Sequence, residues 1–195
     1  MKTIFKFSAM VAFVLSTVVS TASETKSSLK ASFSAKSMIF QLDGLSKKAN
    51  VVFMDIDEVV LYSENVVNKK KYAKKFDLRN LKLGIYSLSM DDDLKTIKYI
   101  LSVEDKNVKI LSKEETYKPT FNRKEGVVYL NFLNSDSKQV SIIVMDNDSR
   151  VIFEETITDS TIVEKAFNFE NAYEGNYIVV MKKGDNTYYN AVAVD

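Results

Sequence analysis

Apolar and polar residues alternate along most of the chain beyond its first 22 residues. Val, Ile, Phe and Tyr recur at every second position in short runs, and each run ends in a cluster of Asp, Asn, Gly, Ser or Lys. A period of two is that of a strand with one face on a core, and turn clusters every 8–12 residues or so are typical of sandwiches and barrels. No window beyond residue 22 shows the 3.6-residue period of a helix. The pattern therefore predicts an all-β protein.

The runs give the expected strands. In the second half of the chain they cover 127–133, 140–145, 151–157, 163–169, 176–181 and 187–194. In the first half they cover 51–54, 59–66, 72–78, 85–90 and 96–103, preceded by less regular runs at 29–33 and 38–42. Residues 108–111 are expected to form the first strand of the second domain, and Pro119 suits an edge strand or a bend.

The chain also resembles itself. Residues 52–103 shifted by 91 positions fall on 143–194 without a gap, with 13 identities in 52 positions. A fixed period means that one supersecondary unit is built twice. Six or seven antiparallel strands per unit predict two tandem immunoglobulin-like β-sandwich domains, at 23–104 and 105–195. Phe76 with Leu78, and Phe167 with Phe169, are expected to be core pairs, because residues i and i+2 share a face.

Residues 1–22 are typical of a secretory signal peptide. Lys2 and Lys6 precede an apolar run at 7–19, and small residues stand at the cleavage site, 20–22. The alternative is an uncleaved N-terminal anchor, for which the run is short, since a membrane span needs about 20 residues. We expect an exported chain without a further membrane span, in the periplasm, at the cell surface or outside the cell.

Composition excludes several kinds of chemistry. The chain has no Cys, so disulfides and attachment of lipid to a cysteine are excluded. The absence of His and Cys also removes the commonest general base, thiol nucleophile and zinc ligands. Residues 23–195 hold 25 basic and 26 acidic residues, and this balance argues against nucleic acid or an anionic membrane as the main partner. We assign no catalytic residue.

Two acidic segments are the candidate metal sites. Asp55 and Asp57, and Asp146 and Asp148 at the matching positions, place oxygen donors at i and i+2, as calcium ligands require. Both segments lie between apolar runs where a hairpin turn is needed, and Asp is favoured in turns for its local hydrogen bonds. We interpret them as turns, with calcium binding as the alternative.

A glycine followed two residues later by a tyrosine stands at the same strand entry in both repeats, as Gly84 with Tyr86 and as Gly175 with Tyr177. In immunoglobulin-like sandwiches a tyrosine at this place turns its hydroxyl back to an upstream backbone group, which is called a tyrosine corner. The alternative is a tyrosine that stacks on a ligand. We interpret the pattern as structural, because both copies keep it.

Charged and aromatic clusters give further candidates. The lysines at 69–71, 74 and 75 protect a strand edge or attract acidic glycans or lipopolysaccharide. The acidic loop 91–93 corresponds to a basic loop, 182–184, in the second repeat, as expected for a solvated loop or for a divergent binding loop. Tyr99, Tyr188 and Tyr189 are candidates for stacking on sugar rings, and one of the adjacent pair must face outward.

The second repeat carries a recognisable order of motifs: Val151-Ile152-Phe153, then Phe167-Asn168-Phe169, then Gly175-Asn176-Tyr177, then Val192-Ala193-Val194. It is similar to small secreted β-sandwich modules of bacteria, which include immunoglobulin-like envelope domains and the C-terminal sorting domains of the type IX secretion system. The resemblance implies a sandwich fold and a place in the cell envelope.

Together these features indicate an exported, non-catalytic binding or structural module of the bacterial cell envelope. It would recognise protein or glycan through loops or edge strands, since edge strands offer unpaired backbone groups. The alternatives are a calcium-stabilised adhesion module and a carboxylate-based hydrolase, which would need a deep acidic cleft. No cofactor other than calcium is a candidate.

Overall fold

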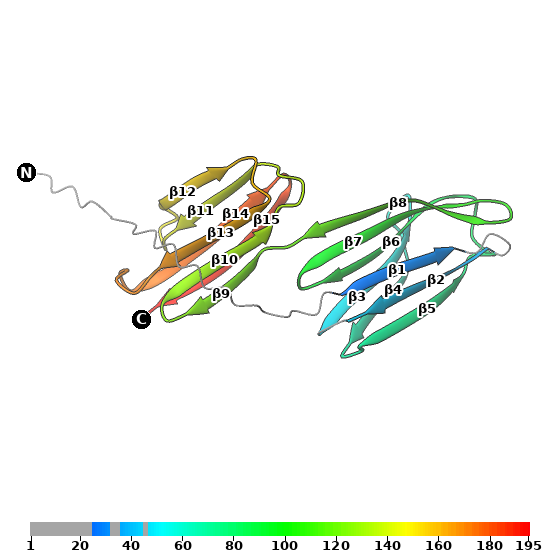
Figure 1. The fold of residues 1–195 in the computed structure, drawn as a ribbon, viewed down its shortest axis with the longest axis horizontal. Coiled ribbons are helices and arrows are strands. Elements are labelled where there is room, and N and C mark those ends of the chain that lie inside the picture. The colour runs from blue at the N-terminus through cyan, green and yellow to red at the C-terminus, as the bar shows by residue number, and fades with distance from the viewer. Residues whose placement is uncertain (1–24, 32–35, 45–46) are drawn as a thin grey trace, which may run out of the picture.

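The computed structural model describes residues 25–31, 36–44 and 47–195. Within these ranges every regular element is a strand, and the strands form two β-sandwiches that lie end to end (Figure 1). The fold expected from the sequence, two tandem antiparallel β-sandwiches, is confirmed. The predicted signal peptide at residues 1–22 lies outside the described residues.

The first sandwich packs a three-stranded sheet, ordered β1-β2-β5, against a five-stranded sheet, ordered β4-β3-β6-β7-β8. All its strand pairs are antiparallel. Its strands are β1 (Lys26–Ala31), β2 (Ser37–Asp43), β3 (Lys48–Asp55), β4 (Val60–Val67), β5 (Lys71–Asp77), β6 (Gly84–Asp92), β7 (Lys95–Val103) and β8 (Val108–Tyr117).

The second sandwich packs a three-stranded sheet, ordered β13-β10-β9, against a four-stranded sheet, ordered β12-β11-β14-β15. Its pairs are also antiparallel. Its strands are β9 (Thr120–Lys124), β10 (Val127–Leu133), β11 (Val140–Met145), β12 (Val151–Ile157), β13 (Ile162–Asn168), β14 (Gly175–Lys183) and β15 (Asn186–Val194).

One strand differs from the sequence-based expectation. Residues 108–111 do not open the second sandwich but begin β8, which pairs with β7 from Lys95↔Tyr117 to Val103↔Val108. β8 therefore extends a sheet of the first sandwich, and only Lys118 and Pro119 separate it from β9. Its charge-rich sequence alternates poorly, because as an edge strand it buries little beyond Val108.

The internal repeat of the sequence is a repeat of structure. β5, β6 and β7 match β13, β14 and β15 residue for residue at the 91-position shift. The register of β3 against β4 shifts between Phe53 and Met54, and that of β11 against β12 shifts at the matching place, between Val144 and Met145. The two copies therefore share irregular features as well as strands.

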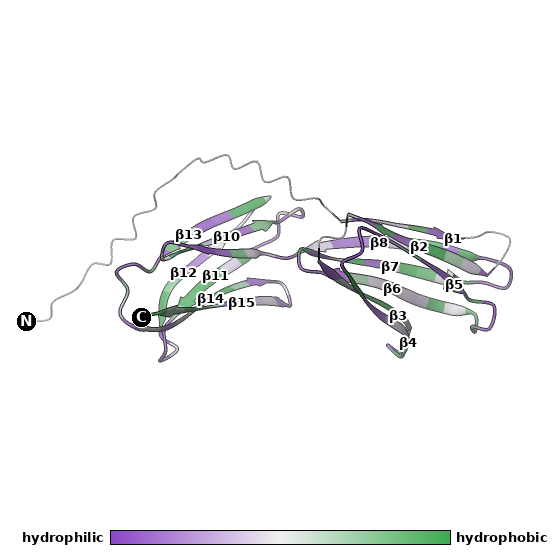
Figure 2. Cartoon of the chain, turned by 90° about the horizontal axis from the view of Figure 1, so that it is seen from below, coloured by the Kyte–Doolittle hydropathy of each residue, from purple (hydrophilic) through white to green (hydrophobic). Residues whose placement is uncertain are grey.

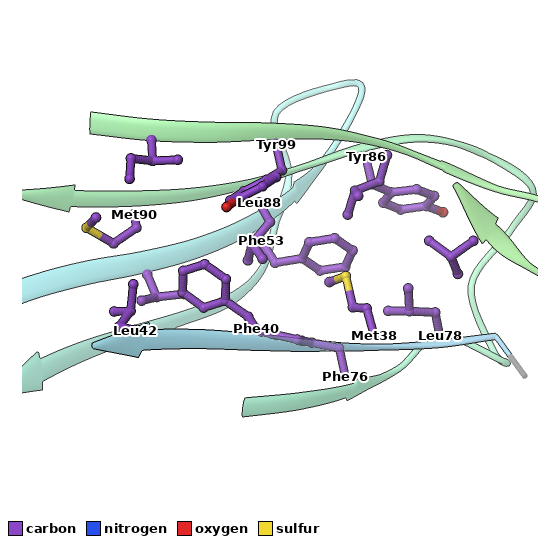
Figure 3. Packing of buried hydrophobic residues seen from close by; sticks show 14 of the residues in the cluster. Met38, Phe40, Leu42, Phe53, Phe76, Leu78, Tyr86, Leu88, Met90 and Tyr99 are labelled. Carbon is purple, nitrogen blue, oxygen red and sulfur yellow. The ribbon is translucent and has the colours of Figure 1, made fainter. Parts of the chain in front are cut away.

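Each sandwich has its own core between its two sheets. In the first, Met38, Phe40 and Leu42 of β2 face Leu88 and Met90 of β6 (Figure 3). Each side chain of this size contributes about 1.5–3 kcal/mol when fully buried. Buried and more exposed residues alternate along β2, β6, β10 and β11, as the predicted period of two requires, and Figure 2 shows hydrophobic and hydrophilic stretches in the strands of both sandwiches.

The expected core pairs are confirmed. Phe76 and Leu78 are buried in the first core, and Phe169 is buried in the second with Phe167 packed against it. Phe76 also makes an edge-on contact with Tyr62 of β4, at 5.2 Å between ring centroids.

Both predicted tyrosine corners are present. The Tyr86 hydroxyl donates to the backbone oxygen of Lys82 at 3.0 Å, and the Tyr177 hydroxyl donates to that of Tyr173 at 2.8 Å. Both rings are nearly buried. These tyrosines therefore hold the loop before β6 and β14 onto the sandwich, and they are not free to stack on a ligand.

Candidate binding surfaces

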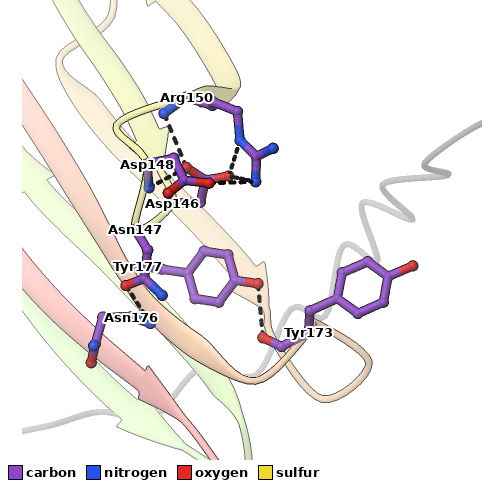
Figure 4. Close-up of polar contacts among 7 residues, drawn as sticks. All are labelled: Asp146, Asn147, Asp148, Arg150, Tyr173, Asn176 and Tyr177. Atoms are coloured by element: carbon purple, nitrogen blue, oxygen red, sulfur yellow. Dashed lines mark hydrogen bonds and ion pairs between the residues drawn. The ribbon is translucent and has the colours of Figure 1, made fainter.

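The two acidic segments are hairpin turns. Asp55 Oδ1 accepts the backbone N–H groups of Asp57 and Val59, at 3.0 and 2.9 Å. Asp146 Oδ1 accepts those of Asp148 and Arg150 in the same way, both at 3.0 Å (Figure 4). One carboxylate oxygen of each segment is thus used to close the turn between two strands.

The second turn also has a cation of its own. The Arg150 guanidinium lies 2.7 Å from Asp146 Oδ2 and 3.3 Å from Asp148 Oδ2 (Figure 4). Desolvation raises the pKa of Asp146, but the hydrogen bonds from Arg150 and Asp148 outweigh it and hold that pKa below its usual value. The arginine thus pairs with both carboxylates of this turn. Among residues 25–31, 36–44 and 47–195 no group of three or more His, Cys, Asp or Glu is placed to hold a metal ion.

The lysines of β5, at 71, 74 and 75, separate into two sets. Lys74 turns toward the edge of the sandwich, where its Nζ lies 3.9 Å from Glu64 Oε2 and 4.5 Å from the Tyr62 ring centroid. The hydroxyls of Tyr62 and Tyr72 donate to the same carboxylate. These hydrogen bonds, that from Tyr62 above all, hold the pKa of Glu64 below its usual value. In the second sandwich the matching residues keep only the ion pair, Lys165 with Glu155 at 2.7 Å.

The other set lies on an outer sheet surface. Lys71 and Lys75 of β5 are exposed, as are Lys26 and Lys30 of β1, which is the strand at the opposite edge of the same three-stranded sheet. The register aligns them in two rows, Lys26–Asp43–Lys71 and Lys30–Ile39–Lys75. Sequence reasoning missed Lys26 and Lys30, because only the strand register brings them next to β5. We call Lys26, Lys30, Lys71 and Lys75 the lysine face.

The three tyrosines that are candidates for stacking on sugar rings differ in exposure. Tyr99 is buried at 4% exposure and its hydroxyl lies 3.0 Å from Ser27 Oγ, so the expectation that it is exposed is wrong. It stands on the inward face of β7, next to buried Ile97 and Leu101 two residues away on either side. Tyr188 packs against the second core, whereas Tyr189 is 68% exposed, as expected for one of an adjacent pair in a strand.

The acidic loop 91–93 belongs to the junction of the two sandwiches. Asp92 is buried and its Oδ1 accepts the backbone N–H groups of Leu94 and Lys95, both at 2.8 Å. Lys118, next to Pro119, donates to Asp91 Oδ2 at 2.9 Å and to the Asp92 backbone oxygen at 2.7 Å. These contacts attach the start of the second sandwich to the β6–β7 hairpin of the first.

A cavity of about 340 Å³ lies beside these contacts. Leu94 and Tyr117 line it from the first sandwich, and Phe132, Leu133 and Ile162 line it from the second. Its polar residues include Asp92 and Lys118, whose hydrogen bonds to the hairpin have been described. The cavity therefore lies between the two sandwiches and is lined by apolar side chains from each of them.

Comparison with known proteins finds similarity in solved structures only. No protein-family model and no curated protein matches the chain. A biofilm-associated protein, described as its BSP domain, matches over 85% of this chain and 29% of its own length, with 13% identity and a TM-score of 0.28. A two-domain fibronectin type III segment of chicken tenascin matches over 88% of this chain and 100% of its own length, with 8% identity and a TM-score of 0.30. The FN1-FN3 domains of chicken CNTN1 match over 82% and 60%, with 9% identity and a TM-score of 0.27. At this distance the fold assignment rests on the strand pairing itself.

Proposed function

We propose that the protein is an exported, non-catalytic binding module of the bacterial cell envelope, and that its first sandwich binds an acidic polysaccharide. The observation that carries this proposal is the lysine face. Its four lysines are exposed and lie on one surface of the sheet β1-β2-β5. Strand spacing sets them at the corners of a rectangle of about 10 by 14 Å.

The lysine face has little negative charge to neutralise it. None of its four lysines lies within 4.0 Å of a carboxylate in the part of the chain that is described. Asp43 lies between Lys26 and Lys71 as the acidic residue of the two rows, and Asp77 further along β5 pairs with Arg79 at 2.6 Å. A chain of regularly spaced carboxylates or sulfates matches such a surface.

Charge is also unequal between the sandwiches. Residues 25–118 hold 18 basic and 13 acidic residues, whereas residues 119–195 hold 7 basic and 12 acidic residues. The net charge of the two sandwiches together is near zero, although the first sandwich is basic and the second is acidic. A field of this kind orients an anionic polymer toward the first sandwich and away from the second.

Five carboxylates at the turns and strand edges already make structural contacts. Asp55 and Asp146 close turns, Asp92 caps the hairpin at the junction, and Glu64 and Glu155 each pair with a lysine. Binding therefore accounts for the surfaces of this molecule better than hydrolysis does.

Export rests on the leader sequence at residues 1–22. In the described part of the chain no helix is long and apolar enough to cross a membrane. The chain recovered from periplasm or medium should begin at Ser23, and its N-terminal sequence is the direct measurement of this step.

The experiment compares two fourfold variants of equal net charge. One changes the lysine face to glutamine, and the control changes four exposed lysines elsewhere, Lys82, Lys98, Lys106 and Lys182. Binding to a uronic-acid polysaccharide and to a neutral glucan is measured over a range of salt, since exposed charge interactions weaken as salt rises.

We expect the lysine-face variant to lose at least tenfold in affinity for the acidic polymer, which corresponds to about 1.4 kcal/mol. The control variant should lose less than threefold, and the neutral glucan should bind to none of the proteins. An equal loss of affinity in both variants would mean that the interaction depends on net charge and not on the lysine face. The proposal would be refuted if the unmodified protein does not bind the acidic polymer.

A further inference from the structure

The last strands of the two repeats occupy matching positions in the repeat but differ in their neighbouring strands. β7 and β15 match at the 91-residue shift, and each pairs on one side with the preceding strand, β6 or β14. On its other side β7 carries β8, a ten-residue strand. Among the strands that the structure describes, β15 pairs with β14 alone. In the second sandwich the site that β8 fills in the first is thus open.

The open side of β15 presents specific backbone groups. The Arg123 guanidinium donates to the Ala193 backbone oxygen at 2.8 Å, so this oxygen points away from β14. In an antiparallel strand, alternate residues direct both N–H and C=O to the same side. Thr187, Tyr189 and Ala191 therefore point their backbone groups to the open side as well. They are the counterparts of Thr96, Lys98 and Ile100, which face β8.

β15 carries little of the protection usual for an edge strand, because the Arg123 guanidinium of β9 covers it only at Ala193. Exposed edges are normally guarded by charged side chains, proline or bulges, because unpaired strands associate. The other seven strands at sheet edges here, β1, β4, β5, β8, β9, β12 and β13, all contain charged residues. β15, with the sequence NTYYNAVAV, has no charged residue and no proline.

The outer surface beside this edge is more apolar than its counterpart in the first sandwich. Ile178 on β14 and Tyr189 on β15, both exposed, stand where the first repeat has Ser87 and Lys98. Two repeats with a common backbone have thus diverged toward a polar surface where the edge is covered and toward an apolar one where it is open.

We infer that β15 is a dimerisation edge, at which two copies of the chain pair their β15 strands antiparallel about a two-fold axis. This inference goes beyond the proposed role, since it needs no polysaccharide. A second copy is the occupant because its own β15 is the one described edge strand without a charged residue, and the segment from Thr187 to Ala191 lies before the place that Arg123 covers. A two-fold axis makes such an edge self-complementary. The pairing joins two four-stranded sheets into one and sets Tyr189 of each copy near that of the other.

The first test is the mass in solution. We expect sedimentation of the full exported chain to pass from monomer to dimer between about 1 and 500 µM, since interfaces of this small size are usually weak. Tyr189→Lys installs the residue of the covered strand, and Ala191→Pro removes an N–H on the open side. Each should raise the dissociation constant at least tenfold. The matched control Lys98→Tyr changes the covered strand β7 and should leave it unchanged.

The second test measures geometry and uses the absence of cysteine from the chain. A spin label at Ile178→Cys should report a distance between copies of about 15–30 Å, as expected for strands that flank the joined edges at 4.7–4.9 Å per strand. The same label at the matching position, Ser87→Cys, should report no such distance. A monomer at every concentration would overturn the inference, as would a dimer that keeps its affinity in Tyr189→Lys and Ala191→Pro. Either result would leave polysaccharide binding untouched, because the lysine face is on the other sandwich.

Discussion

The hydroxyl of Tyr177 is the smallest group whose removal tests the corner of the second sandwich. Tyr177→Phe keeps the ring, which packs on Phe169 at 5.3 Å between centroids, and removes the 2.8 Å hydrogen bond to the Tyr173 backbone oxygen. Tyr86→Phe does the same in the first sandwich, where the ring stacks on Phe53 at 5.6 Å and the bond to Lys82 measures 3.0 Å.

The expected loss is close to that of one neutral hydrogen bond. A bond of this kind contributes about 0.5–1.5 kcal/mol net, and an acceptor left buried and unsatisfied costs about 1–3 kcal/mol. Because water can reach a loop carbonyl near the surface, we expect about 1 kcal/mol in each sandwich. A sandwich of this size should then melt about 4–8 °C lower.

Urea unfolding, followed by far-UV circular dichroism, measures the free energy, and hydrogen exchange shows which sandwich has weakened. Tyr173→Phe is the matched control. Its ring is 89% exposed and only its backbone oxygen takes part in the corner, so its stability should stay within about 0.5 kcal/mol of the original. The reasoning is refuted if Tyr177→Phe costs no more than Tyr173→Phe, or if Tyr177→Phe weakens the first sandwich as much as the second.

Three further outcomes follow from single positions. Gly175→Ala should lower the free energy of unfolding by about 1–3 kcal/mol, and by more than Gly84→Ala does. The reason is that a Cβ at Gly175 would lie 2.8 Å from Asn147 Nδ2, whereas a Cβ at Gly84 meets nothing within 4 Å. Equal losses of the two variants in urea unfolding would contradict this. The pKa of Asp77 is held at about 2, mainly by the side-chain hydrogen bond from the neighbouring arginine, against an ordinary value of 3.8. Its stabilisation is thus complete above that ordinary value and lost as pH falls through about 2, so the difference in melting temperature from Asp77→Asn should be constant at neutral pH and vanish in acid. Millimolar calcium should leave the melting temperature unchanged, because both carboxylate oxygens of Asp146 already accept hydrogen bonds; a rise that Asp146→Ala abolishes would establish the calcium-stabilised alternative.

Local pattern was sufficient for most of the fold. The strands 127–133, 140–145 and 151–157 have the predicted bounds, because alternation and turn residues act within a few positions. The tyrosine corners were also predictable, since glycine and tyrosine at fixed spacing are both required by the backbone path. Repetition strengthened each assignment by providing a second copy.

Pairing between distant segments could not be predicted in the same way. The sequence places residues 108–111 in the wrong sandwich, because an edge strand buries little and its sequence does not indicate which strand it pairs with. The lysine face depends on the register of β1 against β2 and of β2 against β5, which joins residues about 45 positions apart. For the same reason, the alternation in β7 shows which residues share a face of the strand with Tyr99, but it does not show that this face is buried against the other sheet.

The direct passage of β8 into β9 has a mechanical consequence. Thr25, just before β1, and Lys118, just after β8, both line the cavity at the junction, so the first sandwich is held at one pole. Tension between these points loads the hydrogen bonds of β8 one after another from Tyr117 and not all together. β8 would peel away and release about 30–35 Å of chain before the core is strained. The molecule would then yield by lengthening, as an extensible tether does, and the edge of β7 would be unpaired only while the chain is being pulled.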